Sequence, residues 1–239
     1  MPCIEVTESC PSTNAALAAR AASAPHGFTL CARVQTAGRG QRGNSWEAEP
    51  YKNLTFSILL RPQNFAASRQ FELSMLVALA VADTIDALAG SQITQVKWPN
   101  DIYVGHSKIC GILIENSLIG ANLDYAIAGV GVNINQTVFR SDAPNPISLA
   151  SISGKTYDLD KALAMFAEAI AGAVAGYDGD CAGLLARYQN RLWRSDGVHP
   201  FREPGGPVFS ASITAIDPAG PISLSNGKTY AFKEIVFVL

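Results

Sequence analysis

The most informative stretch of this sequence reads Lys97-Trp98-Pro99-Asn100-Asp101. Its proline fixes the backbone just before two side chains that carry oxygen, and these suit a Mg²⁺ ion or a substrate amine. Seven residues beyond Asp101, Lys108 opens an apolar segment in which Gly111 allows another group to approach the backbone closely. Taken alone, Lys108 is more typical of a solvated strand edge, and Asn100-Asp101 of an ordinary turn. The neighbouring motifs decide between these interpretations.

A loop rich in glycine and arginine lies upstream and reads Gly38-Arg39-Gly40-Gln41-Arg42-Gly43. It matches the pattern of dinucleotide-binding loops, which open a helix and are followed about 20 residues later by an acidic residue. Here residues 53–60 form a predicted strand, no helix starts, and no acidic residue stands in that strand. We therefore reject the dinucleotide site. Glycine exposes backbone N–H groups and arginine supplies planar donors, so the loop is a candidate phosphate site, with a solvated turn as the alternative.

A third glycine-punctuated segment reads Gly129-Val130-Gly131-Val132-Asn133. The missing side chains leave room for a flat ligand, and Asn133 offers both a donor and an acceptor. Close packing between strands is the alternative explanation.

Periodicity and turn residues predict a mixed domain followed by a small all-β one. In the first part, Ser12, Thr13 and Asn14 precede a helix over 15–22, and later helices are expected at 66–89, ended by Gly90, and at 159–175 and 181–193. Strands are expected at 28–35, 53–60, 108–115 and 125–133. After residue 193, proline and glycine precede strands at 208–216, 221–225 and 229–232, with Asn226-Gly227 as a type I′ turn.

Composition excludes several classes of protein. The 239 residues are 48% hydrophobic and 16% charged with a net charge of −2, which indicates a packed core and argues against a nucleic acid partner. The five scattered cysteines form no disulfide framework, and His26, His106 and His199 form no metal-ligand cluster. Neither a targeting leader nor a membrane-length apolar run is present, so we expect a cytoplasmic protein without a membrane partner.

The motifs, in their order and spacing, resemble those of biotin–protein ligases over nearly the whole chain. The resemblance rests on Ser12-Thr13-Asn14, the Gln35 to Trp46 segment, residues 97–101, the Lys108 and Gly111 pair, and residues 129–133. It implies an α+β fold, with a mixed sheet and flanking helices like class II aminoacyl-tRNA synthetases, over residues 1–193. A small SH3-like β-barrel is implied for residues 194–239.

The resemblance also implies an activity in which ATP activates biotin as biotinyl-AMP and the biotinyl group passes to a lysine of a biotin carboxyl carrier domain. Mg²⁺ would accompany ATP, with Asp101 as its candidate ligand. Arg39, Lys108 and Asp101 are the implied catalytic residues. Biotin would contact Ser12, Thr13, Asn14, Gln35, Gly38, Arg39, Gly40, Gln41, Lys108, Gly111 and Gly131. ATP would contact Arg39, Arg42, Trp46, Asn100, Asp101, Lys108 and Asn133.

Within that resemblance, each group has an expected role. Ser12, Thr13 and Gln35 would bind the ureido ring, and Gly111 and Gly131 would make room for the bicycle. Arg39 and Lys108 would face the carboxylate and the α-phosphate, Trp46 would stack on adenine, and Asp101 would serve the acceptor lysine as a base. Gln41 stands where many members carry arginine, which puts retention of biotinyl-AMP in doubt.

Three other functions compete with this interpretation. A lipoate ligase would use the same adenylation chemistry, but the arginine-rich motif of that family is missing. A biotin-responsive repressor needs a helix-turn-helix domain, for which the eleven residues before Ser12 leave no room in this sequence. A non-catalytic biotin-binding protein would not require Arg39, Asp101 and Lys108 together. The acceptor protein and the choice between monomer and homodimer stay open.

Overall fold

The computed structural model describes residues 3–40, 46–141 and 145–239. Its centre is a seven-stranded sheet in the order β1-β2-β3-β7-β6-β5-β4. The strands are β1 (Ile4–Cys10), β2 (Thr29–Gln35), β3 (Leu54–Leu60), β4 (Thr94–Lys97), β5 (Asp101–Val104), β6 (Ser107–Ile119) and β7 (Asn122–Val132). β1 pairs with β2 in parallel and all other neighbours are antiparallel, so the predicted mixed sheet is confirmed.

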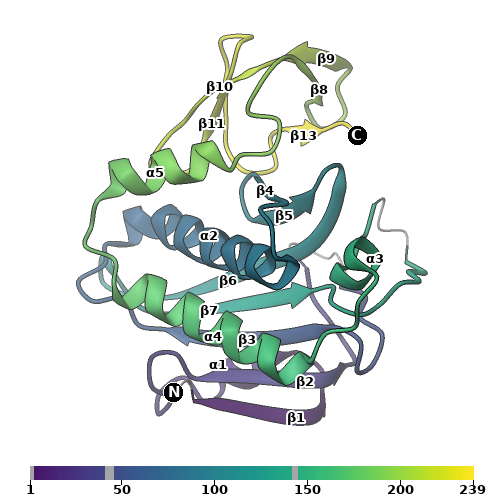
Figure 1. Ribbon diagram of the computed structural model, residues 1–239. Coiled ribbons are helices and arrows are strands. Elements are labelled where there is room, and N and C mark those ends of the chain that lie inside the picture. The colour runs from purple at the N-terminus through teal and green to yellow at the C-terminus, as the bar shows by residue number, and fades with distance from the viewer. Residues whose placement is uncertain (1–2, 41–45, 142–144) are drawn as a thin grey trace.

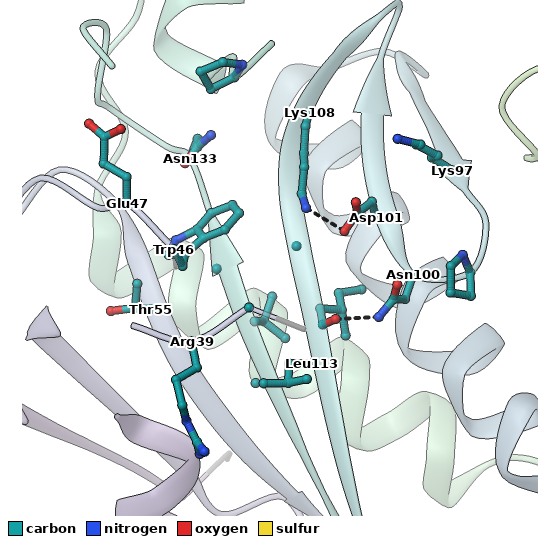
Figure 2. Close-up of a pocket in the computed structure, with 18 of the residues that line it drawn as sticks. Arg39, Trp46, Glu47, Thr55, Lys97, Asn100, Asp101, Lys108, Leu113 and Asn133 are labelled. Atoms are coloured by element: carbon teal, nitrogen blue, oxygen red, sulfur yellow. Dashed lines mark hydrogen bonds and ion pairs between the residues drawn. The ribbon is translucent and has the colours of Figure 1, made fainter. Parts of the chain in front are cut away.

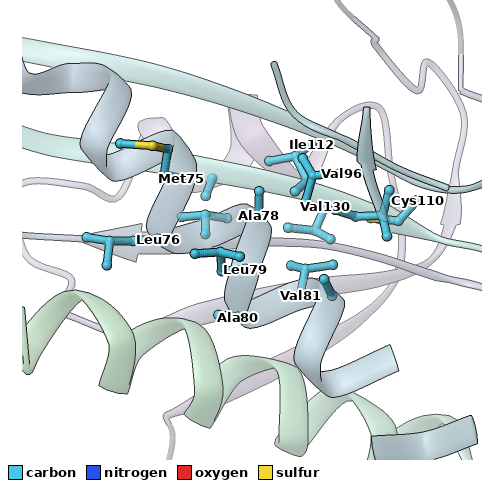
Figure 3. Close-up of a cluster of buried hydrophobic side chains, with 14 of the residues drawn as sticks. Met75, Leu76, Ala78, Leu79, Ala80, Val81, Val96, Cys110, Ile112 and Val130 are labelled. Carbon is cyan, nitrogen blue, oxygen red and sulfur yellow. The ribbon is translucent and has the colours of Figure 1, made fainter. Parts of the chain in front are cut away.

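The helices cover the sheet unequally. α2 (Gln70–Ala89) and α4 (Leu159–Ala175) run side by side over one face, whereas the short α1 (Thr13–Ala18) packs against β2, β3 and β7 (Figure 1). Two further helices, α3 (Leu149–Ser153) and α5 (Cys181–Asn190), follow the sheet in sequence. The large core forms where α2 meets the sheet, and Figure 3 shows Met75, Ala78 and Val81 of α2 in one cluster with Ile112 and Val130 of the sheet.

Alternation along three central strands separates the core from the opposite face. Phe56, Ile58, Cys110, Ile112, Val130 and Val132 belong to the large core, at even positions of β3, β6 and β7. Odd positions on the same strands form cross-strand rows: Thr55, Gly131 and Gly111 lie in one row, and Ser57, Gly129 and Leu113 in the next. Because successive side chains point to opposite faces of a strand, these residues, all small except Leu113, lie on the face opposite the large core.

The C-terminal residues form two three-stranded sheets, β10-β11-β12 and β13-β8-β9. Their strands are β8 (His199–Arg202), β9 (Val208–Ala211), β10 (Ile213–Ile216), β11 (Ile222–Leu224), β12 (Thr229–Tyr230) and β13 (Val236–Phe237). They sit beside β4, β5 and α5 at one end of the larger sheet (Figure 1). Closure into an SH3-like barrel and the boundary at residue 193 stay predictions.

Several local predictions are confirmed. Helix 159–175 has the predicted bounds, and Gly90 ends α2 with a φ of 78°. The Ser12 hydroxyl caps α1 by accepting a bond from Ala15 N. The strands expected at 28–35, 53–60, 108–115 and 125–133 are all present, with β6 and β7 extended toward their shared turn.

Other predictions were wrong at their edges. α1 lies over 13–18 rather than 15–22, and the segment 66–69 turns as a 3-10 helix (Ala67–Arg69) before α2 begins. α5 ends at Asn190 because Trp193 N donates to Val96 O, which ties the next residues to β4. The predicted strand 208–216 breaks at residue 212, and its halves, β9 and β10, belong to different sheets.

The predicted type I′ turn at Asn226-Gly227 is also wrong. Gly227 adopts a φ of 80°, but Asn226 is not among the described residues with positive φ, as a type I′ turn would require. Gly227 N donates to Leu224 O, and Leu224 N donates to Lys228 O. This pattern fits a type I turn followed by a glycine bulge.

Candidate functional site

A cavity of about 890 Å³ opens over the rows of small residues on the sheet. It gathers most of the predicted site residues, namely Ser12, Thr13, Asn14, Gln35, Arg39, Gly40, Trp46, Asn100, Asp101, Lys108, Gly111, Gly131 and Asn133. Gly38 is not among the residues that line the cavity, and a Cβ there would come within 2.9 Å of Gln35 Nε2. Gln41 and Arg42 lie outside the described residues.

One wall of the cavity is a polar cluster built by the start of α1 and the end of β2. Thr13 donates to Gln35 Oε1 twice, from its backbone N at 2.9 Å and from Oγ1 at 3.2 Å. Ser57 Oγ, on β3, lies 2.7 Å from Thr13 Oγ1. Because each member is held by another, the cluster offers a flat polar ligand donors and acceptors in fixed positions.

Asn14 is held by protein groups on every side. Its Oδ1 lies 2.5 Å from Ser57 Oγ, and its Nδ2 donates to Glu115 Oε2 at 2.7 Å and to Leu113 O at 3.3 Å. A Cβ at Gly129 would overlap Asn14 Oδ1. Ser57 and Glu115 were missed by the sequence analysis, because neither stands in a motif. The sequence analysis named Gly129 as part of a glycine-rich segment, but it did not predict the contact of Gly129 with Asn14.

Lys108 and Asp101 meet inside the cavity. The two residues lie on neighbouring antiparallel strands, β6 and β5, and Lys108 Nζ is 2.7 Å from Asp101 Oδ1 (Figure 2). Both side chains are about one-third exposed, at 31% and 28%. The pair can exchange partners with an entering anion or amine at low cost, because neither group is deeply desolvated.

Arg39 takes a position that the sequence did not predict. Its side chain points away from the Lys108–Asp101 pair (Figure 2), and one guanidinium nitrogen lies 3.6 Å from Glu115 Oε2. Both side chains are about half exposed. The expected approach of Arg39 to the reacting anions would require it to leave Glu115.

The indole of Trp46 lies on the glycine floor of the cavity. Gly111 and Gly131 are cross-strand partners, and a Cβ at Gly111 would come within 3.0 Å of the ring, while one at Gly131 would overlap it. Lys108 Nζ is 5.7 Å from the ring centroid. Trp46 Nε1 is buried and has no hydrogen-bond partner within the described part of the chain. An indole therefore fills the space that the sequence assigned to the biotin bicycle.

Two asparagines that line the cavity, Asn100 and Asn133, are each anchored through one end of the side-chain amide. Asn100 Nδ2 donates to Ile112 O at 2.5 Å, and Asn133 Nδ2 donates to Ile147 O at 3.0 Å. Asn133 Oδ1 is buried without a partner among the residues described. Since a buried acceptor without a partner is costly, Asn133 Oδ1 is suited to bind a ligand that donates a hydrogen bond there.

Lys97 and the C-terminal strands add a further wall. The sequence analysis quoted Lys97 in its motif without giving it a role, and it assigned none to the C-terminal strands. Lys97 Nζ donates to Tyr103 Oη at 3.0 Å and lies 5.9 Å from the ring of Phe237. Burial lowers the pKa of Lys97, and the positive charges of Lys108 and Arg194 lower it further. The negative charge of Asp101 acts in the opposite direction and offsets part of this effect. The signal for this wall was the aromatic content of the last residues, which carries no local pattern.

A resident metal centre is not evident. Among residues 3–40, 46–141 and 145–239, no three His, Cys, Asp or Glu side chains gather around a common point. Mg²⁺ commonly arrives with a nucleotide and uses one or two protein carboxylates, a role that Asp101 beside Asn100 fits. None of the described helices is long and apolar enough to cross a membrane.

Comparison with solved structures supports the fold. A biotin protein ligase from Aquifex aeolicus, solved in complex with biotin and ATP, superposes with a TM-score of 0.81 over 98% of this chain and 97% of that chain. Sequence identity is 22%, so the likeness concerns the fold.

Comparison with curated sequences gives closer relatives. A biotin–[acetyl-CoA-carboxylase] ligase of Paracoccus denitrificans is 33% identical over 165 residues, which cover 67% of this chain and 68% of that protein. The bifunctional ligase/repressor BirA of Bacillus spizizenii is 36% identical over 141 residues, or 57% of this chain. The match with the Bacillus protein spans only 42% of the relative's length.

The sequence profile of one family matches residues 5–133, more than half of the chain. That segment contains the Thr13–Gln35 cluster, the Lys108–Asp101 pair and the glycine floor. The chain belongs to the biotin/lipoate A/B protein ligase family.

Proposed function

We propose that the chain is a biotin–protein ligase, which forms biotinyl-AMP from biotin and ATP and transfers the biotinyl group to a lysine of a biotin carboxyl carrier domain. One observation carries the proposal: the polar Thr13–Gln35 cluster, the glycine floor and the Lys108–Asp101 pair line the same cavity. Its volume of about 890 Å³ lies within the usual range for ligand pockets.

Biotin would bind with its ureido ring against Ser12, Thr13 and Gln35, where fixed donors and acceptors match a cyclic urea. The bicycle would lie over Gly111 and Gly131 once the indole of Trp46 moves aside. The indole would then be free to stack on adenine, and Asn133 Oδ1 would accept a bond from the nucleotide.

In the first step, a biotin carboxylate oxygen attacks the α-phosphorus of ATP and pyrophosphate leaves. Two anions must approach each other, so cations that face the reacting atoms lower the barrier. Lys108 would exchange Asp101 for the reacting anions, and Arg39 would join it from the loop. Asp101 is the residue that would hold a Mg²⁺ ion brought in with ATP, and such an ion would supply positive charge near the phosphates.

In the second step, the neutral ε-amine of the acceptor lysine attacks the carbonyl carbon of the mixed anhydride, and AMP leaves. This step needs mainly positioning and a base for the proton of the amine. Asp101 would accept that proton, because it lies at the cavity wall beside Lys108. A cytoplasmic location would give the enzyme access to such carriers.

The proposal is tested by biotin-dependent exchange of labelled pyrophosphate into ATP. We expect exchange with biotin and none without it. Exchange with lipoate but not with biotin would indicate a lipoate ligase instead, and binding of biotin without exchange would indicate a non-catalytic protein. Mass spectrometry of a carrier domain after incubation with biotin and ATP then tests the transfer step.

A further inference from the structure

One carboxylate outside the motifs contacts two predicted site residues from separate segments. Glu115 lies on β6, and its Oε2 accepts a bond from Asn14 Nδ2 at 2.7 Å. The same oxygen lies 3.6 Å from a guanidinium nitrogen of Arg39. Glu115 therefore links the wall beside α1 to the arginine of the glycine-rich loop.

The two contacts differ in rigidity. Asn14 is 4% exposed and is held by Ser57, Leu113 and the space left by Gly129, so it holds the Glu115 carboxylate in place. The contact with Arg39 is longer, and its side chains are 52% and 45% exposed. Exposed ion pairs are weak and readily exchanged, so Arg39 is the partner that can leave.

Arg39 can therefore bind one of two competing partners, Glu115 or an anionic ligand in the cavity. In this structure it lies on Glu115 and points away from the Lys108–Asp101 pair (Figure 2). An anionic ligand in the cavity would draw the guanidinium inward, because a charge-assisted bond to phosphate is stronger than an exposed ion pair. Asn14 would keep the Glu115 carboxylate from following.

We propose that Glu115 is a positioning residue that holds Arg39 in a resting position and competes with ATP for it. The proposal rests on the proposed adenylation activity. Glu115 would thus weaken ATP binding without contacting ATP, while its bond to Asn14 supports the wall at which biotin is expected to bind.

Glu115→Gln separates the two contacts, because the amide oxygen still accepts from Asn14 but the negative charge that attracts Arg39 is gone. We expect the KM for ATP in pyrophosphate exchange to fall about 2-fold to 5-fold, the range that exposed ion pairs allow. Glu115→Leu removes both contacts, and should in addition weaken biotin binding measured by calorimetry without ATP. Glu168→Gln, an exposed glutamate on α4, is the matched control and should leave the KM unchanged.

The decisive measurement is a double-mutant cycle with Arg39→Ala. If Glu115 acts through Arg39, Glu115→Gln has no effect on the KM for ATP in the Arg39→Ala background. The same fall in both backgrounds, or no fall with Arg39 present, would overturn the inference. If Glu115→Gln unfolds at a clearly lower temperature than the unmodified protein, Glu115→Asp provides the second variant. Its shorter side chain draws the carboxylate back from Arg39, so it should lower the KM for ATP less than Glu115→Gln is expected to. Absence of exchange in the unmodified protein would instead overturn the proposed function, and this inference with it.

Discussion

At the residue scale, the Lys108–Asp101 pair is the clearest electrostatic element of the cavity. We expect Lys108→Ala to lower the rate of biotinyl-AMP formation at least about 10-fold, equivalent to about 1.4 kcal/mol of barrier, because it removes a cation from the developing charge. Lys155→Ala, at an exposed position, is the control. Single-turnover formation of the adenylate measures both, and a near-normal rate for Lys108→Ala would exclude the assignment.

The glycine floor gives a second prediction. A Cβ at Gly131 would overlap the indole of Trp46, so Gly131→Ala should displace the ring and also fill space intended for the ligand. We expect weaker biotin binding together with a change in tryptophan fluorescence of the free protein. Gly172→Ala is the matched control, because Gly172 lies in α4 and a Cβ there would meet nothing within 4 Å. Unchanged fluorescence in Gly131→Ala would mean that the indole does not rest on the floor in solution.

Position 41 lies outside the described residues, and its prediction follows from the sequence alone. Gln41 is a neutral donor, so it lacks the positive charge and the planar pair of N–H donors with which arginine binds phosphate. Biotinyl-AMP should therefore leave this protein faster than it leaves Gln41→Arg. A chase after a single turnover compares the two release rates, and equal rates would show that position 41 does not control retention.

At the element scale, a buried glutamate joins α2 to the segment between α4 and α5. Glu72 Oε2 accepts bonds from Arg69 at 2.6 Å and from Tyr177 Oη at 2.5 Å. Burial by itself would raise the pKa of Glu72, but the bonds from Arg69 and Tyr177 hold the pKa below its ordinary value. Ionised Glu72 therefore stabilises the fold, since the native state binds its proton more weakly than the unfolded chain does.

This network predicts a pH-dependent loss of stability. The contribution of Glu72 is fully present above its unfolded pKa of about 4.3 and is lost as the pH falls through the lower folded pKa. Glu72→Gln should cost about 1 to 3 kcal/mol at neutral pH, and the difference from the unmodified protein should shrink in acid. Urea unfolding at several pH values measures this. A difference independent of pH would show that ionisation of Glu72 is not the cause.

At the scale of the whole molecule, aromatic packing joins the C-terminal sheets to the larger one. The Phe237 ring lies 6.5 Å from that of Trp98, 6.1 Å from Trp193 and 5.0 Å from Phe201. Trp98 Nε1 also donates to Gly220 O at 2.9 Å. The cavity and the C-terminal strands therefore share the residues 97–101 as a common support.

We expect Phe237→Ala to lower the free energy of unfolding by about 3 to 5 kcal/mol, as large-to-small changes in a core do. The unfolding of the two parts should also separate, so that fluorescence and circular dichroism no longer give coincident transitions. Leu239→Ala, at a side chain that is 53% exposed, is the control and should change stability by less than about 0.5 kcal/mol. Coincident transitions in Phe237→Ala would mean that other contacts couple the two parts.

Local patterns in the sequence were sufficient for elements whose signals lie within a few residues. The bounds of α4 follow from helical spacing, and the end of α2 follows from Gly90. The motifs also predicted many of the residues that line one cavity, because glycine and charged residues at strand positions carry a chemical signal of their own.

Only the tertiary structure determined what those residues contact. Several strands have sequences with weak periodicity, because they are short or half exposed; these are β1, β4, β5, β8 and β13. Pairing with neighbouring strands defines them. Ser57 and Glu115 contact Asn14 because the strands align in one register, and register depends on the packing of the whole sheet. The resting positions of Trp46 on the glycines and of Arg39 on Glu115 are likewise decided by space and charge that distant segments supply, which no local sequence pattern encodes.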